Sequence, residues 1–237
     1  MNIIAVIPAR YAATRFPGKL MQQLGNKPII RHVFDNTLAT GLFSDVLVVT
    51  DSDIIHKEIM SNGGKAIMSK QEHESGSDRI AESVEEMNVD VIVNVQGDEP
   101  FIKKEPLEKL VRLFDDPVVQ VASLMRKISK DEAANPNNVK VVTDKNGYAL
   151  YFSRSIIPHQ RDSGAMAEYF LHIGVYAYKK EALMNFTKWP QSVLEKTEKL
   201  EQLRYLENGV KIKMAETDYV NIAIDTPEDL ENAKKYF

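Results

Sequence analysis

The 237-residue chain contains no cysteine and a single tryptophan. The absence of cysteine excludes disulfides, thiolate zinc sites, iron–sulfur clusters and a cysteine nucleophile. No stretch approaches the roughly 20 consecutive apolar residues that a membrane-spanning helix needs. The first apolar run, residues 3–7, has no basic segment before it and is followed by Pro8 and Arg10. It therefore indicates a buried strand and not a secretion signal, and we expect a cytoplasmic protein without a membrane partner.

The chain also lacks an excess of either charge. Lys and Arg number 30 and Asp and Glu number 34, which gives a net charge of −4. This balance excludes a global attraction to nucleic acid, so any phosphate must be bound by a local basic cluster. Two common phosphate-binding motifs are missing as well. There is no G-x-G-x-x-G, and Ala13 stands where the first glycine of a Walker loop would fall.

Short apolar runs alternate with helical patterns through the first half of the chain. The runs lie at 3–7, 46–50, 65–68, 91–96 and 118–125, and the helical patterns at 29–39, 54–62, 78–87 and 105–114. Runs that are apolar on both faces and separated by helical lengths predict parallel strands covered on both sides. The pattern is typical of a doubly wound, Rossmann-like α/β fold with a mostly parallel sheet.

The second half is richer in antiparallel signals. Strands at 139–143 and 148–153 flank a hairpin turn at 144–147, and a long alternating strand follows at 170–178. A helix at 193–208, a strand at 211–215 and a final helix opening at 225–229 complete the chain. We expect a nucleotide-binding domain of residues 1–125 and 186–237. A smaller β-rich insertion of residues 126–185 completes one continuous folding unit.

A basic loop follows the first strand. It carries Arg10, Arg15 and Lys19 within ten residues and has no acidic residue. In a doubly wound sheet this loop lies at the carboxyl edge, where nucleotides bind. Two guanidinium forks and a mobile ammonium suit a triphosphate. The alternative is a solvated basic loop.

Acidic residues follow another buried strand. Gly97 permits close backbone approach there. Asp98 is expected to project into the crevice at the carboxyl edge of the sheet, beside the basic loop. Carboxylates at such a strand end often hold Mg²⁺, which also takes water and phosphate oxygens. Asp225 is a candidate for the same metal site. The alternative for both residues is capping of a following helix.

Two further groups combine polar and small residues. Around Ser75, the helix cap is expected at Ser77 or Asp78, and small residues leave room for a flat base. On the strand at 170–178, alternation places His172 and Tyr176 on one face with a glycine between them. This suggests a polar floor, although a lone histidine is more often structural. On the helix at 193–208, Glu201 and Arg204 are spaced to pair on the surface.

Taken together and in order, these segments resemble the CMP-KDO synthetase (3-deoxy-D-manno-octulosonate cytidylyltransferase) family. The matching strings are residues 7–11, 94–100, 148–154, 200–204 and 225–229. The resemblance implies a nucleotidyltransferase α/β domain with a smaller dimerisation insertion. It also implies that CTP and the eight-carbon acid sugar KDO react to give CMP-KDO and pyrophosphate. Mg²⁺ as cofactor, a homodimer and a role in lipopolysaccharide assembly are implied in the same way.

The resemblance also assigns roles residue by residue. Arg10, Arg15 and Lys19 correspond to triphosphate ligands, Asp98 and Asp225 to metal ligands, and Ser75, Gly76, Arg79 and Gln96 to the cytidine site. Gln96 also lies beside the sugar acid, whose other ligands are Arg154, His172, Tyr176, Glu201 and Gln202. Lys19, Arg15, Asp98 and Asp225 form the implied catalytic set, and no general base is assigned. The sequence departs from the family at Leu20, where proline is frequent, and matches it weakly over residues 160–169.

Two other functions remain open. One is CMP activation of a related acid sugar, 8-amino-KDO or sialic acid. The sialate enzymes usually have Arg-x-Gly-Ser-Lys in the first loop, which differs from residues 10–15 here. The other is a silent nucleotide-binding regulator, which would be expected to lose the carboxylates that this chain keeps at Asp98 and Asp225.

Overall fold

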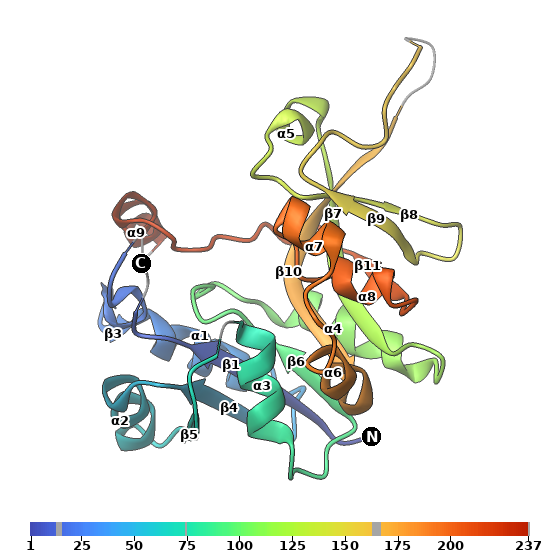
Figure 1. The fold of residues 1–237 in the computed structure, drawn as a ribbon. Helices are drawn as coiled ribbons and strands as arrows, with labels where there is room; N and C mark the ends of the chain where they lie inside the picture. Colours follow the sequence, from blue (N-terminus) through green and yellow to red (C-terminus); the bar gives the residue numbers. More distant parts are fainter. Residues whose placement is uncertain (13–15, 74, 163–166, 237) are drawn as a thin grey trace. The chain divides into compact units, whose positions relative to one another are not determined.

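The chain folds into two compact units of alternating strands and helices (Figure 1). A computed structural model describes residues 1–12, 16–73, 75–162 and 167–236. Unit 1 contains Met1–Leu107, Lys179–Thr187 and Asn221–Phe237, and unit 2 contains Glu108–Tyr178 and Lys188–Val220. The predicted α/β class with mainly parallel strands is confirmed. None of the helices in the described ranges is long and apolar enough to cross a membrane.

Unit 1 is built on four parallel strands in the order β6–β1–β4–β5. Their bounds are Ile3–Ala9 for β1, Asp45–Thr50 for β4, Ala66–Met68 for β5 and Val91–Asn94 for β6. Almost every side chain of β1, β4 and β6 is buried, as their continuous apolar runs predict. Because the strands are parallel, their carboxyl ends lie at one edge of the sheet.

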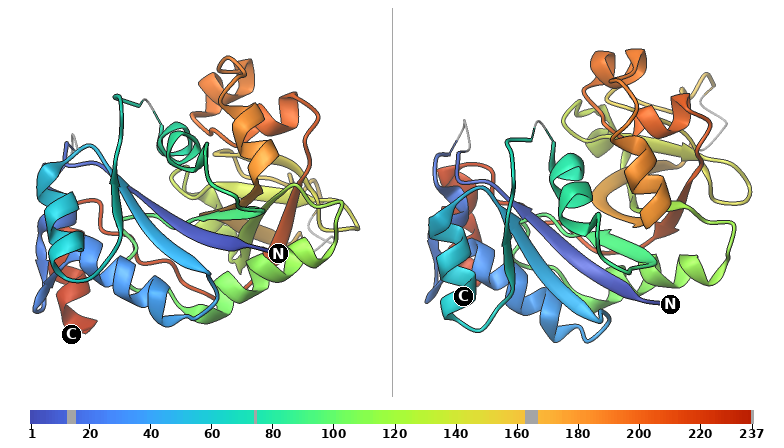
Figure 2. Two further views of the ribbon diagram at one scale, coloured as in Figure 1. Left: turned by 90° about the horizontal axis from the view of Figure 1, so that it is seen from below. Right: turned by 60° about the horizontal axis from the view of Figure 1, so that its bottom comes forward.

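Helices cover both faces of this sheet. The unit 1 helices are α1 (Ile29–Ala39), α2 (Asp53–Ser61), α3 (Gly76–Val84), α6 (Lys180–Phe186), α9 (Pro227–Ala233) and the short η1 (Lys19–Met21) and η3 (Lys234–Tyr236). Helices α1 and α3 lie on opposite faces (Figure 2). A small hairpin of β2 (Gln23–Leu24) and β3 (Lys27–Pro28) was not predicted. Helix α4 (Lys104–Arg112) contains the boundary to unit 2.

Unit 2 combines parallel and antiparallel pairing. Its elements are η2 (Leu113–Asp115), β7 (Val121–Ile128), α5 (Lys130–Ala134), β8 (Lys140–Thr143), β9 (Ala149–Ser153), β10 (Tyr169–Lys179), α7 (Val193–Glu198), α8 (Leu203–Glu207) and β11 (Ile212–Glu216). β7 pairs antiparallel with β10 and parallel with β11, and β8 pairs antiparallel with β9 and β10. The predicted hairpin between β8 and β9 is present, and Gly147 supplies its positive φ of 74°.

Unit 2 is larger than the predicted insertion of residues 126–185. It also takes in residues 108–125 and 188–220, because β7 and β11 are hydrogen-bonded neighbours. In the other direction, residues 179–187 belong to unit 1. There Lys180 donates its ammonium to the carbonyls of Glu85 and Met87. Sequence periodicity locates strands but does not show which of them pair, so it did not locate these boundaries.

The predicted helix over 193–208 is wrong, because the chain forms two short helices there. Lys199 ends α7 in the left-handed region with φ of 56°. The guanidinium of Arg204 then binds the carboxylate of Glu195 through two hydrogen bonds of 2.5 and 2.8 Å. Both side chains are buried, so Arg204 is not the surface residue that the helical pattern predicted. A buried bidentate pair of this kind fixes the angle between α7 and α8.

Candidate active site

Three backbone segments meet at the carboxyl edge of unit 1. Pro8, at the end of β1, lies against Gly76 at the start of α3 and Gly97 after β6. A Cβ atom on Gly97 would lie 3.0 Å from the carbonyl oxygen of Pro8, whereas one on Gly76 would lie 3.4 Å from the Pro8 ring. The close backbone approach predicted at Gly97 is therefore confirmed.

This contact makes Gly97→Ala a destabilising change. The new methyl group meets backbone that cannot move aside alone, and such overpacking costs about 1–3 kcal/mol. Gly76→Ala is the matched control, because its methyl group makes an ordinary contact and alanine is the better helix former, so we expect no loss of stability. Urea unfolding of both variants measures the difference. Equal stability of the two variants would contradict the tight packing at Gly97.

Lys19 joins two carboxylates from distant parts of the chain. Its ammonium donates to Asp98 Oδ2 at 2.6 Å and to Asp225 Oδ1 at 2.9 Å. The Lys19 side chain is 13% exposed and those of Asp98 and Asp225 are 25% and 43% exposed. Burial opposes the ammonium charge, but the two carboxylates outweigh it and raise the pKa of Lys19 above its usual value. The predicted residues Lys19, Asp98 and Asp225 are thus brought together.

Hydrogen bonds hold the C-terminal segment next to this cluster. The Ile224 amide donates to the carbonyl of Asp98 at 3.0 Å. Thr226 caps α9 by accepting from the Asp229 amide and donating its own amide to the Asp229 carboxylate. Asp225 is therefore not the residue whose side chain caps the helix.

A buried glutamate next to Asp98 was missed by the sequence analysis. Glu99 is 2% exposed and accepts a hydrogen bond of 2.9 Å from the Asn221 side chain. Burial, reinforced by the charge of Asp98, raises the pKa of Glu99 to about 8. Glu99 is thus largely neutral at pH 7, and the carboxylates that bind Lys19 are those of Asp98 and Asp225. Asn221 and Glu99 together tie the C-terminal segment to the turn after β6.

The two carboxylates fit a magnesium ion. Mg²⁺ is usually bound by one or two protein carboxylates, with waters and substrate phosphates completing its shell. Asp98 and Asp225 already converge on one cation, the Lys19 ammonium. The described residues contain no group of three or more metal-ligating side chains, so a cation held here would need further ligands from a substrate or water.

Two of the residues assigned to the cytidine, Ser75 and Arg79, make hydrogen bonds within the protein. Ser75 caps α3 by accepting from the Asp78 amide at 3.1 Å, so the predicted cap at Ser77 or Asp78 is wrong. Arg79 is buried and donates to Asp51 at 2.6 Å and to Ser69 at 3.1 Å. These contacts hold the start of α3 in place at the carboxyl edge of the sheet.

The remaining nucleotide candidates lie on the same edge. Arg10 is exposed immediately after β1, Gln96 is partly buried after β6, and Gly76 opens α3. Arg15 lies outside the described residues.

The sugar-acid candidates of unit 2 include two rings on one face of β10. The rings of His172 and Tyr176 are 5.3 Å apart, as the strand alternation predicts. The β-bulge between residues 173 and 176 was not predicted. At Gly174, between the two rings, an added Cβ would meet no atom within 4 Å, so the expected open space is present.

Among the sugar-acid candidates, two buried polar atoms have no hydrogen-bond partner within the described residues. They are the Tyr176 hydroxyl and the Gln202 side-chain nitrogen, and burial raises the pKa of Tyr176 well above its usual value. Buried polar groups normally have partners, so a ligand or water is expected to supply them. Glu201, next to Gln202, is exposed.

His172 is held as a neutral ring. Phe152 packs edge-on against it at 5.0 Å, and its Nε2 atom lies 3.0 Å from Ser123 Oγ. The Ser123 hydroxyl faces the carbonyls of Ile173 and Val175 and donates its proton there. Donation to these carbonyls favours the tautomer with the histidine proton on Nε2, which leaves Nδ1 as an acceptor. Burial lowers the pKa of His172 to about 3.

This low pKa predicts acid sensitivity. Between pH 6.5 and 3 the unfolded chain binds a proton at His172 that the folded chain does not, so the free energy of unfolding falls as pH falls. The loss reaches about 3 kcal/mol by pH 4. His172→Gln should remove this part of the pH dependence, which thermal melts of both proteins from pH 7 to 4 measure. Parallel curves for the two proteins would show that His172 titrates normally.

Arg154 follows β9 and is anchored on one side. Its Nε donates to the Glu198 carbonyl at 2.8 Å and its Nη1 to the Pro136 carbonyl at 3.3 Å, while its backbone amide binds the Glu198 carboxylate. A guanidinium has five N–H donors, so the outer edge formed by Nη1 and Nη2 retains donors for a carboxylate. The anchoring carbonyls fix the orientation of that edge.

The family of the chain follows from its sequence and fold together. A profile described as "Cytidylyltransferase" matches residues 4–212. The chain belongs to the cytidylyltransferase family. Within it, a curated relative from Flavobacterium johnsoniae named 3-deoxy-manno-octulosonate cytidylyltransferase is 60% identical over 99% of this chain and 98% of its own length. A relative of the same name from Bacteroides thetaiotaomicron is 44% identical over 100% of this chain and 98% of its own length.

Solved structures agree with this assignment. A CMP:2-keto-3-deoxy-manno-octonic acid synthetase complexed with CTP superposes with a TM-score of 0.96 at 40% identity, covering 100% of this chain and 98% of that one. The 4-diphosphocytidyl-2C-methyl-D-erythritol synthase from Anaerococcus prevotii superposes with a TM-score of 0.67 at 17% identity, over 99% and 97% of the two chains. The second match shows a shared fold alone.

Proposed function

We propose that this protein transfers CMP from CTP to KDO, giving CMP-KDO and pyrophosphate. The observation that carries the proposal is the cluster of Lys19, Asp98 and Asp225 at the carboxyl edge of unit 1, the position at which a doubly wound fold binds nucleotides. The identity of the sugar is inferred from the 60% identical relative, which is named for this substrate.

In this reaction the C2 hydroxyl of KDO attacks the α-phosphorus of CTP and pyrophosphate leaves in line. Such transfers depend on positioning and on stabilisation of charge more than on covalent help from the protein. Lys19 has one N–H donor beyond those that bind Asp98 and Asp225, and we assign it to a phosphate oxygen. Arg10 and Arg15 bind the triphosphate beside it, and Arg15 and Lys19 neutralise charge that develops on the leaving pyrophosphate.

Asp98 and Asp225 would hold Mg²⁺ in this proposal. When bound, the ion neutralises phosphate charge and favours loss of the proton from the anomeric hydroxyl. The contribution of the chain is to keep both carboxylates converged on one point, through the Ile224 amide and the Asn221–Glu99 hydrogen bond. No side chain is assigned as a general base.

Residues of unit 2 recognise the sugar acid. Arg154 binds the carboxylate, and the Tyr176 hydroxyl and the Gln202 side chain bind sugar hydroxyls. The lack of a hydrogen-bond partner for these two atoms among the described residues supports this role. Neutral His172 offers Nδ1 as an acceptor, and Glu201 completes the unit 2 set. In unit 1, Gln96 is assigned to the sugar acid by the family resemblance alone. Ser75, Gly76, Arg79 and Gln96 surround the cytidine, Ser75 through its backbone and Arg79 through its contact with Asp51.

The wider setting of the protein belongs to the same proposal. We expect a cytoplasmic homodimer, as the family resemblance implies. We expect no binding to nucleic acid or membrane, because a net charge of −4 gives no global attraction to either. The product serves lipopolysaccharide assembly. Sedimentation analysis of the purified protein tests the dimer.

A substrate panel tests the proposed reaction. Pyrophosphate release is measured with CTP, Mg²⁺ and one acid sugar at a time: KDO, 8-amino-KDO or sialic acid. We expect the highest kcat/KM with KDO. A higher kcat/KM with 8-amino-KDO or sialic acid would show that the protein prefers that sugar. CTP binding by calorimetry without turnover on any sugar would favour a regulator.

A further inference from the structure

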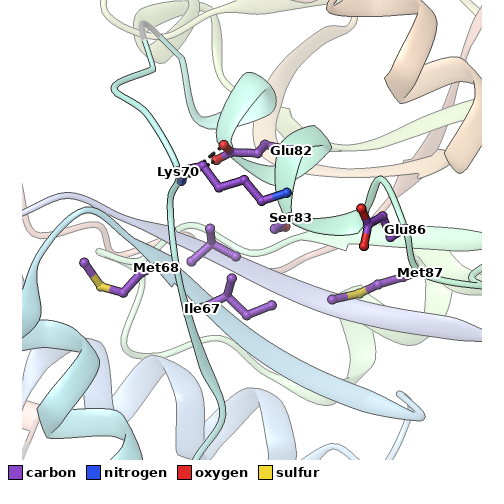
Figure 3. A pocket seen from close by; sticks show the side chains of 8 residues that line it. Ile67, Met68, Lys70, Glu82, Ser83, Glu86 and Met87 are labelled. Carbon is purple, nitrogen blue, oxygen red and sulfur yellow. Dashed lines mark hydrogen bonds between the residues drawn. The ribbon is translucent and has the colours of Figure 1, made fainter.

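The segment that leads from β5 to the start of α3 is fastened to α3 by side chains. We call residues 69–73 the nucleotide strap. The Glu82 carboxylate accepts from the Lys70 amide through both oxygens, at 3.1 and 3.2 Å (Figure 3). It also accepts from His73 Nε2 at 2.8 Å. The His73 and Glu82 side chains are 6% and 13% exposed. One carboxylate therefore holds two points of the strap in a site that is mostly shielded from water.

The strap is connected to α3 at both of its ends as well. Arg79 donates to Ser69 at the beginning of the strap and to Asp51. Beyond the strap, Ser75 caps the helix. The position of the strap, and with it the approach to Ser75 and Gly76, is thus set by side chains of α3.

Two pockets border the strap, whose residues are exposed or half-buried. One pocket, of about 300 Å³, is lined by Val49, Ile67, Met68, Lys70, Glu82, Ser83, Glu86 and Met87 (Figure 3). A second, of about 670 Å³, is lined by Lys70, Gln71, Glu72, His73 and Asp78 together with Ala81, Glu82, Glu85, Met184 and Thr187. Lys70 and Glu82 line both pockets. Hydrogen bonds, and not burial in a core, keep the strap in place: Arg79 and the Thr50 carbonyl bind Ser69, and Glu82 binds Lys70 and His73.

We infer that Glu82 is a positioning residue for nucleotide binding, which holds the nucleotide strap so that Ser75 and Gly76 are ready for the cytidine. This inference rests on the proposed function, which places the cytidine at Ser75 and Gly76. Glu82 itself does not touch the reacting atoms. It acts through the Lys70 amide and the His73 ring.

A positioning role has a distinct kinetic signature. When the strap is ordered for only a fraction of the time, the apparent Kd for CTP rises by the inverse of that fraction. Saturating CTP restores the ordered state, so kcat is largely preserved. A strap ordered about one-tenth of the time corresponds to a tenfold weaker Kd. The KM for the sugar acid should not change.

The test compares Glu82→Ala and Glu82→Gln with Glu86→Ala as a matched control. Glu86 is an exposed glutamate that lines the pocket in Figure 3, and its carboxylate makes no hydrogen bond or ion pair with any described residue. CTP affinity is measured by calorimetry without sugar. We expect about a tenfold weaker Kd for Glu82→Ala, a smaller loss for Glu82→Gln, which keeps an acceptor, and a change below about twofold for Glu86→Ala. In Glu82→Ala the Lys70 amide should also exchange faster with deuterium.

Other outcomes would overturn the inference. Faster exchange at Lys70 with an unchanged CTP Kd would show that the strap does not serve the nucleotide. A lowered melting temperature with equal losses in kcat and in both KM values would show a general structural role. The proposed function fails separately: in that case the wild-type protein binds no CTP, or binds CTP and transfers it to no acid sugar.

Discussion

Asp98→Asn should lower turnover by about 10²–10³-fold while CTP binding remains detectable, by analogy with the loss of a single electrostatic group that acts in the transition state. The substitution keeps the size of the side chain and its ability to accept from Lys19, which lies 2.6 Å away. It removes the negative charge that a divalent cation needs. Calorimetry with CTP and initial rates of pyrophosphate release at saturating Mg²⁺ measure the two effects.

Two further variants test whether the loss of turnover in Asp98→Asn comes from the metal site. Asp225→Asn should behave in the same way, because its carboxylate shares the Lys19 ammonium and does not cap α9. Asp53→Asn is the control, an exposed aspartate in the first turn of α2 that should leave turnover within about twofold. Near-normal turnover of Asp98→Asn would refute the metal assignment. A lowered melting temperature of Asp225→Asn with intact activity would restore the capping role.

Arg154→Lys should raise the KM for KDO by about 10–100-fold, the range expected when a hydrogen-bonded charge pair loses its geometry. Lysine keeps the charge but cannot present two parallel N–H donors to a carboxylate. It also lacks the guanidinium contacts with Glu198 and Pro136 that orient the side chain. The KM for CTP should change little, whereas kcat should fall somewhat because the reactants are less well aligned.

A surface arginine of the same unit provides the control for this variant. Arg112 is exposed and pairs with Glu108, so Arg112→Lys should leave both KM values unchanged. Equal increases in the KM values of Arg154→Lys for CTP and KDO would place Arg154 on the phosphates or in a purely structural network. Melting temperatures of both variants separate a loss of anchoring from a loss of sugar recognition.

The sequence predicted the framework of unit 1 well, because its strands carry strong local signals. The runs that became β1, β4 and β6 are apolar on both faces, and helix α1 occupies the predicted range, 29–39. Parallel topology then places residues that follow different strands at one edge. Asp98 was found in this way, since its position after a buried strand is visible in the chain.

Contacts that depend on distant segments were harder to predict. Nothing near Glu99 in the sequence shows that Asn221 will bind it, or that it will be buried and largely neutral. The break at Lys199 has no glycine or proline signal, and it is stabilised by the buried Glu195–Arg204 pair. Glu82 appears as an ordinary helical glutamate until the strap is seen to fold back onto it.

The most direct measurement of the central claim is ³¹P NMR of the purified protein with CTP, KDO and Mg²⁺. A transfer to the C2 hydroxyl predicts loss of the three CTP resonances, with one phosphodiester signal and pyrophosphate appearing in equal amounts. The same mixture without KDO should keep its CTP. Release of pyrophosphate without a phosphodiester, or unchanged CTP under conditions in which the protein binds it, would contradict the assignment of this chain as a KDO cytidylyltransferase.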